Sequence, residues 1–241
     1  LGSAFYFKGE SKDINLSQIE VSKSKDGGAI RVETEVNSIL LTDWEIKNNG
    51  DAGFLYDGYG LSVIGEVKKK LIIENFSIED NKAYASPAVL VDVKSRSVSI
   101  RKLVANKNRS DVANAAILWV QKDIDSLDIS DVTIRNDSSF SSTKMIDIRV
   151  DTTVLNIHDI EVVSCTGIGL DVYQEFGKAH VYNIRSDSNS GGVYLGISAE
   201  DTIVVRNLSL IHNRGSGIAG GIFNLNLAME MIYRMHCLLE V

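Results

Sequence analysis

The feature that most constrains this chain is an eight-residue pattern that recurs along most of its length. It places apolar residues at positions one, three, six and eight, as in Leu71, Ile73, Phe76 and Ile78 of LIIENFSI. Copies begin 24 to 32 residues apart, at Ile14, Ile39, Leu71, Val98, Leu127, Leu155, Ala179 and Ile203. Of the 32 marked positions, 31 are apolar, alanine included. Each half alternates as a strand with one inward face does, so the repeat predicts a solenoid of short strands.

The two residues skipped in the middle of the pattern predict a corner between two strands. In six of the eight copies the second skipped residue is Asn or Asp, at Asp43, Asn75, Asp131, Asp159, Asn183 and Asn207. These residue types tolerate left-handed backbone angles and satisfy nearby backbone groups. We therefore expect the chain to turn there while the same face stays inside.

A third apolar segment follows most copies after a polar loop. The segments are GGAIRV (27–32), PAVLVDV (87–93), AAILWV (115–120), MIDIRV (145–150), IGLDV (168–172), GVYLGI (192–197) and GGIF (220–223). β-Branched residues dominate them, as strands prefer. We predict an all-β, parallel β-helix of about eight turns over residues 1–224, with three short strands per turn. Residues 225–241, with Met229, Met231 and Met235, are expected to form a tail or a cap.

The alternative fold is a leucine-rich-repeat horseshoe. Ile73, Phe76, Ile78 and Asn81 fit its L-x-x-L-x-L-x-x-N signature, and Asn49, Asn108 and Asn213 take the same asparagine position. The leucine expected two residues after the asparagine is absent, however, and a β-branched strand follows instead. The solenoid of strands is therefore favoured.

Composition limits the partners. The chain has a net charge of −7, and its only basic run is Lys68 to Lys70, so a nucleic-acid partner is not expected. No apolar run reaches membrane-spanning length. Cys165 and Cys237 have no metal-ligand spacing, and the four histidines do not repeat in one column, so no metal site is predicted. The chain begins without methionine, and we expect it to be a segment of a larger protein.

The GGAI of Gly27–Ile30, the GGIF of Gly220–Phe223 and the NFSIEDN of Asn75–Asn81 carry a resemblance to known proteins. The chain resembles the right-handed parallel β-helix superfamily that includes pectate lyases, and the branch with polymorphic-outer-membrane-protein-type repeats in particular. In pectate-lyase-like proteins the corner asparagines stack into an internal ladder. The resemblance implies this structural role for Asn75, Asn183 and Asn207, with Asp43, Asp131 and Asp159 as variants.

Enzymes on such a scaffold usually act on sugars. The candidate catalytic residues are Asp92, Asp147, Asp171 and Arg149 on outward strand positions, with Tyr173 and Tyr194 close by to stack on a sugar ring. A hydrolase would use two carboxylates, and a lyase would need calcium, the only cofactor considered. Because the known motifs of polygalacturonases are absent, we expect no catalytic residue. The two central aspartates, Asp147 and Asp171, should then be solvated, and removing either charge should change stability by no more than about 0.5 kcal/mol.

The function expected from the sequence is structural or adhesive display outside the cell or on its surface, with other surface or matrix proteins or glycans as partners. The alternatives are a polysaccharide lyase or glycoside hydrolase acting on an extended sugar polymer, and a non-catalytic glycan-binding module. The N-x-S/T triplets at Asn108 and Asn136 lie in polar segments and are candidate glycosylation sites.

Overall fold

The computed structural model of the protein describes residues 5–23, 30–49, 60–83, 87–110, 115–139, 143–214, 221–223, 226–227 and 237–240. The long strands are β1 (Phe5–Ser22), β2 (Ile30–Lys47), β3 (Leu61–Glu79), β5 (Val89–Asn106), β12 (Ile168–Asp187) and β13 (Gly191–Ile211). At two levels the equivalent of one long strand is divided into two. These pairs are β7 (Ala115–Gln121) with β8 (Ile124–Arg135), and β10 (Lys144–Arg149) with β11 (Thr152–Val163). The short strands are β4 (Lys82–Ala83), β6 (Arg109–Ser110), β9 (Ser138–Ser139), β14 (Gly221–Phe223), β15 (Asn226–Leu227) and β16 (Cys237–Glu240).

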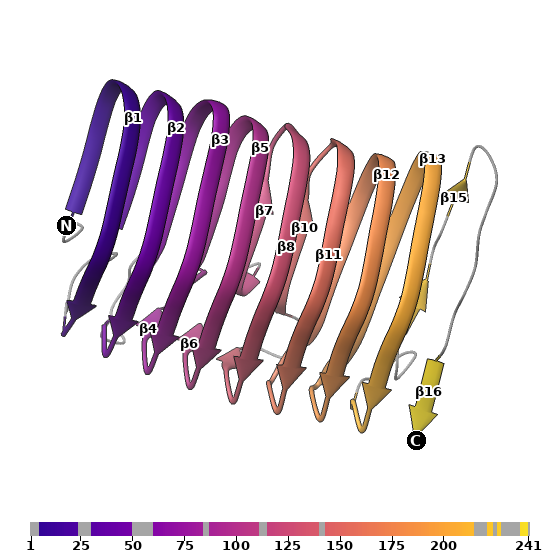
Figure 1. The fold of residues 1–241 in the computed structure, drawn as a ribbon. Coiled ribbons are helices and arrows are strands. Elements are labelled where there is room, and N and C mark those ends of the chain that lie inside the picture. Colours follow the sequence, from indigo (N-terminus) through magenta and orange to yellow (C-terminus); the bar gives the residue numbers. More distant parts are fainter. Residues whose placement is uncertain are drawn as a thin grey trace.

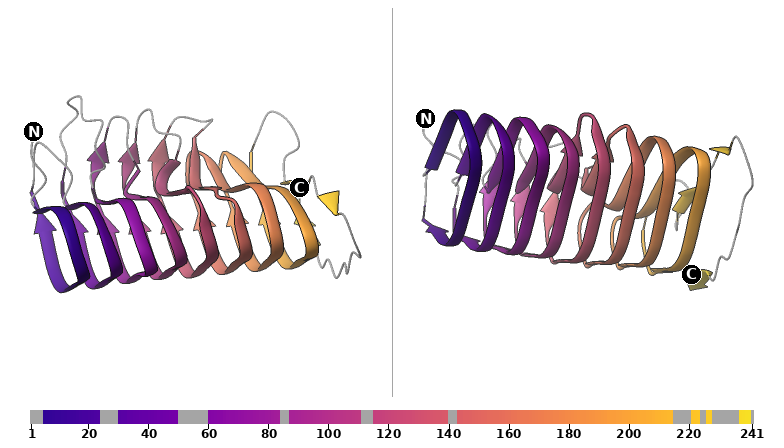
Figure 2. Two further views of the ribbon diagram at one scale, coloured as in Figure 1. Left: turned by 90° about the horizontal axis from the view of Figure 1, so that it is seen from above. Right: turned by 45° about the horizontal axis from the view of Figure 1, so that its top comes forward.

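The long strands stack in parallel, and each level of the stack, which we call a rung, pairs with the rungs before and after it (Figure 1). Copies of the sequence pattern lie in register, since Leu71 on β3 pairs with Ile39 on β2 and with Val98 on β5. Two further views show one elongated coil (Figure 2). The described ranges contain no helix, which excludes the horseshoe. The predicted all-β parallel β-solenoid is confirmed, and the eight copies of the pattern lie in register on successive rungs.

The apolar pattern forms the core. From the second copy onward, every marked residue is no more than 3% exposed. Trp44 and Phe76 stack on neighbouring rungs with their ring centroids 5.1 Å apart. In the first copy Ile14, Leu16 and Ile19 are only partly buried, because β1 pairs with β2 alone among the described strands.

The corners adopt the left-handed conformation that the sequence predicts. All eight residues at the second skipped position have φ between 53° and 60°, including Gln18 and Lys102. Side chains in this corner column bond between rungs, as Asn75 Nδ2 donates to Asp43 Oδ1 at 2.8 Å and Asn183 Nδ2 donates to Asp159 Oδ1 at 2.8 Å. The column is nevertheless on the outside, with Asp43, Asn75, Asp131, Asp159, Asn183 and Asn207 all exposed. The internal position implied by the family resemblance is therefore wrong for these residues.

The internal ladder is built from a second column instead. Its members, which we call the buried ladder, are Asn49, Asn81, Asn108, Asp137, Cys165, Asn189 and Asn213, and the first six are no more than 2% exposed. Asn81 shows the geometry: its Oδ1 accepts from the backbone N–H of Asn49 at 2.9 Å, and its Nδ2 donates to the carbonyl of Ile46 at 2.9 Å. The ladder thus satisfies backbone groups that would otherwise be buried without a partner.

Other expectations about the strands need correction. The three short strands of most turns merge into one bent strand of 18 to 21 residues, such as β2 or β13. The turn before Leu71 has the same segment, which begins at Leu61 on β3 and was not recognised in the sequence. Beyond residue 224, β15 and β16 pair in parallel with β13, so their backbone continues the solenoid. Gly27, Gly220, Met229, Met231 and Met235 lie outside the described residues.

Candidate functional site

Outward side chains on four adjacent rungs, from β7 to β13, form three columns that we call the outer face. The columns are Trp119, Asp147, Asp171 and Tyr194; then Gln121, Arg149, Tyr173 and Gly196; then Asp123, Asp151, Glu175 and Ser198. Neighbouring members of a column are about 4.8 Å apart, the spacing of paired strands. The face therefore repeats its chemistry along the axis of the solenoid, which suits an extended ligand better than a compact one.

The first column holds a buried ion network. Asp147 has no exposed surface and Asp171 is 7% exposed. Lys144 Nζ lies 3.5 Å from Asp147 Oδ2 and 3.3 Å from Asp171 Oδ2, while Arg149 Nε donates to Asp147 Oδ1 at 3.0 Å. Burial raises the pKa of Asp171, although Lys144 opposes the shift. The expectation that both carboxylates are solvated is wrong.

The structure brings three of the four candidate catalytic residues into this network. Asp92 lies apart from it: it pairs in register with Gln121, and its carboxylate forms an ion pair with Lys122 at 3.0 Å. A general acid or base must come within hydrogen-bond reach of its substrate. Asp147 lacks that access because it is fully buried and its carboxylate contacts Arg149 and Lys144.

The second column carries an exposed aromatic surface. Tyr173 is 54% exposed and lies opposite Gly196 on the next rung. The rings of Tyr173 and Tyr194 are 6.5 Å apart between centroids and inclined by 27°. A Cβ at Gly196 would lie 2.6 Å from Tyr173 Cδ2 and 2.9 Å from Tyr194 Cε1. The absence of a side chain at Gly196 therefore lets the two rings converge over it and keeps one of them available to a ligand.

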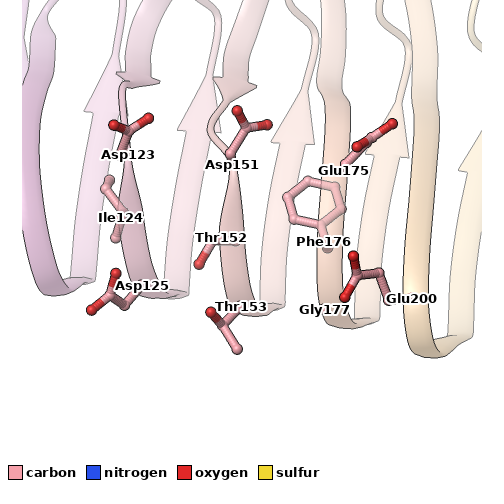
Figure 3. Close-up of a pocket in the computed structure, with 10 residues that line it drawn as sticks. All are labelled: Asp123, Ile124, Asp125, Asp151, Thr152, Thr153, Glu175, Phe176, Gly177 and Glu200. Carbon is pink, nitrogen blue, oxygen red and sulfur yellow. The ribbon is translucent and has the colours of Figure 1, made fainter.

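The third column borders two shallow hollows. One, of about 400 Å³, is lined by Asp151, Tyr173, Gln174, Glu175, Gly196, Ile197 and Ser198. The other, of about 340 Å³, is an acidic groove, where Asp123, Asp151 and Glu175 form a row with Asp125 and Glu200 beside it (Figure 3). Within the described part of the chain, none of these five carboxylates has an ion-pair partner. The groove thus presents hydrogen-bond acceptors and negative charge next to an aromatic ring.

Comparisons with known proteins do not extend this description. No family model, curated protein or solved structure matches the chain. In the ranges that the structure covers, no three acidic, histidine or cysteine side chains are grouped to hold a metal ion. No helix in those ranges is long and apolar enough to cross a membrane.

The two candidate glycosylation sites differ in access. Asn108 is 1% exposed and belongs to the buried ladder, where its Nδ2 donates to the carbonyl of Ile78 at 2.9 Å. It is therefore unavailable to a glycan in the folded protein. Asn136 is exposed and remains a candidate.

Sequence reasoning missed the acidic groove and the role of Gly196. The groove has a weak signal, an acidic residue just after three successive apolar segments, at Asp123, Asp151 and Glu175. Gly196 follows Tyr194 by two residues, so both point outward from the same strand. Neither spacing alone shows that Tyr173, a full turn earlier, lies across that glycine.

Proposed function

We propose that the chain is a rigid, non-catalytic adhesive segment of an extracellular or cell-surface protein, and that it binds an extended glycan along the outer face. The observation that carries the proposal is the ring of Tyr173, 54% exposed and positioned over Gly196 beside a polar hollow. An aromatic ring offers a flat apolar surface for a sugar ring, and the flanking carboxylate and amide groups of Asp151, Gln174 and Glu175 can bond its hydroxyls.

The burial of Asp147 and Asp171 supports binding without catalysis. These two aspartates are the sequence candidates for acid–base chemistry, and they are occupied by Lys144 and Arg149. The exposed carboxylates of the groove have no cation among the residues that line it. We expect neutral polymers to bind better than polyuronates, because a negatively charged polymer would be repelled there.

The test is calorimetric titration of the purified chain with soluble neutral, amino and acidic polysaccharides, together with an assay for cleavage products. A Tyr173→Ala variant should lower affinity by about tenfold or more, as expected for a central aromatic anchor. The matched control is Tyr6→Ala, because Tyr6 is 51% exposed but lies on β1, outside the outer face.

The proposal predicts that Tyr6→Ala binds as the parent does and that no product is released. An absence of binding to every polymer, or an equal loss in the two tyrosine variants, would contradict the assignment of the site. Release of shortened or unsaturated sugar chains would replace it with a polysaccharide-degrading enzyme.

A further inference from the structure

The buried ladder changes its chemistry on two neighbouring rungs. At an asparagine rung the side chain supplies one acceptor and one donor. Asn189 does so: its Oδ1 accepts from the N–H of Cys165 at 2.9 Å, and its Nδ2 donates to the carbonyl of Val162 at 2.8 Å. Asp137 and Cys165 occupy this position without an amide. Each therefore has to meet the same backbone groups with a different side chain.

Asp137 fulfils only the acceptor half of this role. Its Oδ1 accepts from the backbone N–H of Asn108, and from Asn108 Nδ2 at 3.1 Å. The residue is 1% exposed, and its Oδ2 has no hydrogen-bond partner in the described ranges. In a carboxylate, Oδ2 has no proton to donate where an asparagine would place its Nδ2.

The repeat identifies the group that Oδ2 should meet. Each ladder amide donates to the carbonyl three residues before the ladder residue of the preceding rung: Asn81 to Ile46, Asn108 to Ile78, and Asn189 to Val162. For residue 137 this acceptor is the carbonyl of Ala105. A carboxylate oxygen and a carbonyl oxygen are both acceptors, so the ladder bond can form at this rung only if the Asp137 carboxyl group carries a proton.

We propose that Asp137 is held as a neutral carboxylic acid, whose Oδ2–H donates to the Ala105 carbonyl, and that loss of this proton is a pH-dependent switch that weakens the junction between the rungs of Asn108 and Asp137. The protonated acid has the same one donor and one acceptor as the asparagine amide. Ionisation removes the donor and leaves a charge in a buried position, where it is unfavourable without a partner.

Among the residues that the structure describes, no cation pairs with the Asp137 carboxyl group. Burial raises the pKa of Asp137 to about 7, against the opposing effect of the two hydrogen bonds from Asn108. The titratable group on the next rung is Cys165, whose thiol stays neutral because burial raises its pKa to about 12. The cations adjacent in sequence, Lys107, Arg109 and Arg135, are exposed, and Arg135 pairs with Glu161.

The direction of the pH effect follows from these values. An unfolded aspartate loses its proton near pH 3.9, whereas the folded protein retains the Asp137 proton to about pH 7. The contribution of Asp137 to stability is therefore complete below about pH 4, is lost as the pH rises to about 7, and stays at its lowest value above that. Within this window the unfolding constant rises by up to about tenfold per pH unit.

The experiment is equilibrium urea unfolding of the parent and of Asp137→Asn between about pH 4 and pH 9. The difference between the two profiles isolates Asp137 from other titrating groups. We expect the free energy of unfolding of the parent to fall relative to that of the variant as the pH rises to about 7. Above that pH the difference between the two free energies should stay constant. The matched control is Asp131→Asn, the same chemical change at an exposed corner of β8, the strand that ends two residues before Asp137, and it should keep the parent profile.

If Asp137→Asn does not fold, the protonation state of Asp137 can be measured directly in the parent protein. The ¹³Cγ chemical shift of Asp137 in the parent should report a neutral acid at pH 5 to 6, which is roughly two units above the ordinary titration of aspartate. A carboxylate signal in that range would overturn the proposal. Parallel pH profiles for the parent and Asp137→Asn would also overturn it.

Discussion

Removing the Asn81 side chain should show how strongly the stability of the fold depends on the buried ladder. The Asn81 side chain takes part in four hydrogen bonds: it donates to the Ile46 carbonyl and to Asn108 Oδ1, and it accepts from the backbone and the side-chain nitrogen of Asn49. Each such bond between neutral groups contributes roughly 1 kcal/mol. We therefore expect Asn81→Ala to lower the free energy of unfolding by about 4 kcal/mol.

The assay is urea unfolding followed by circular dichroism and by the fluorescence of Trp44 and Trp119, since coincident transitions are needed for a two-state free energy. The control is Asn183→Gly in the exposed corner column. It removes the hydrogen bonds to Asp159 and from Asn207, while glycine retains the left-handed backbone. We expect it to cost about 1 kcal/mol or less. The reasoning is refuted if Asn81→Ala is no more destabilising than Asn183→Gly.

Two further predictions concern the core and the ion network. Ile129→Ala should lower the free energy of unfolding by about 2 to 5 kcal/mol in the same assay. Ile129 is fully buried between Ile100 and Ile157 of the adjoining rungs, so a cavity would remain. A variant as stable as the parent would contradict its place in the core. Asp147→Ala should cost about 3 kcal/mol rather than the 0.5 kcal/mol expected for a solvated charge, because it removes the carboxylate shared by Lys144 and Arg149. Asp201→Ala, at an exposed ion pair with Lys178, is its control and should leave the urea midpoint nearly unchanged.

The fold was predictable because the local rules agree with one another. Inward residues alternate within each strand, and the corner residues between them are of the types that accept left-handed angles. Even Lys102 and Gln18, which are poorer candidates, take that conformation. The packing of eight similar copies outweighs the backbone preference of a single residue.

The internal ladder was misplaced although the sequence contains its signal. Inward residues run Ile73, Phe76, Ile78, and the same skip of two residues continues to Asn81. Asp80, the second residue of that skip, is left-handed as Asn75 is. Asn81 is therefore the next inward position, whereas Asn75 occupies the outward bend. The sequence prediction chose the ladder residues by their type and not by their position in the inward–outward alternation, and it therefore chose the outward column.

The site was only partly predictable for a different reason. Alternation correctly placed Asp147, Asp171, Arg149 and Tyr173 on outward positions, but outward does not mean exposed. The burial of Asp147 and Asp171 depends on Lys144 and Arg149 reaching across the strand and the neighbouring rung. Such contacts are not encoded in the period of the pattern.

The one-dimensional stacking of the rungs also determines how the protein would respond to mechanical force. Among the described strands, each rung pairs only with its neighbours, so tension on the two ends loads the outermost junction first and leaves the interior intact. Successive rungs begin 24 to 32 residues apart, and each released rung would therefore lengthen the chain by roughly 80 to 115 Å at full extension. A solenoid of this design would unfold one rung at a time under tension, while its remaining rungs stay folded.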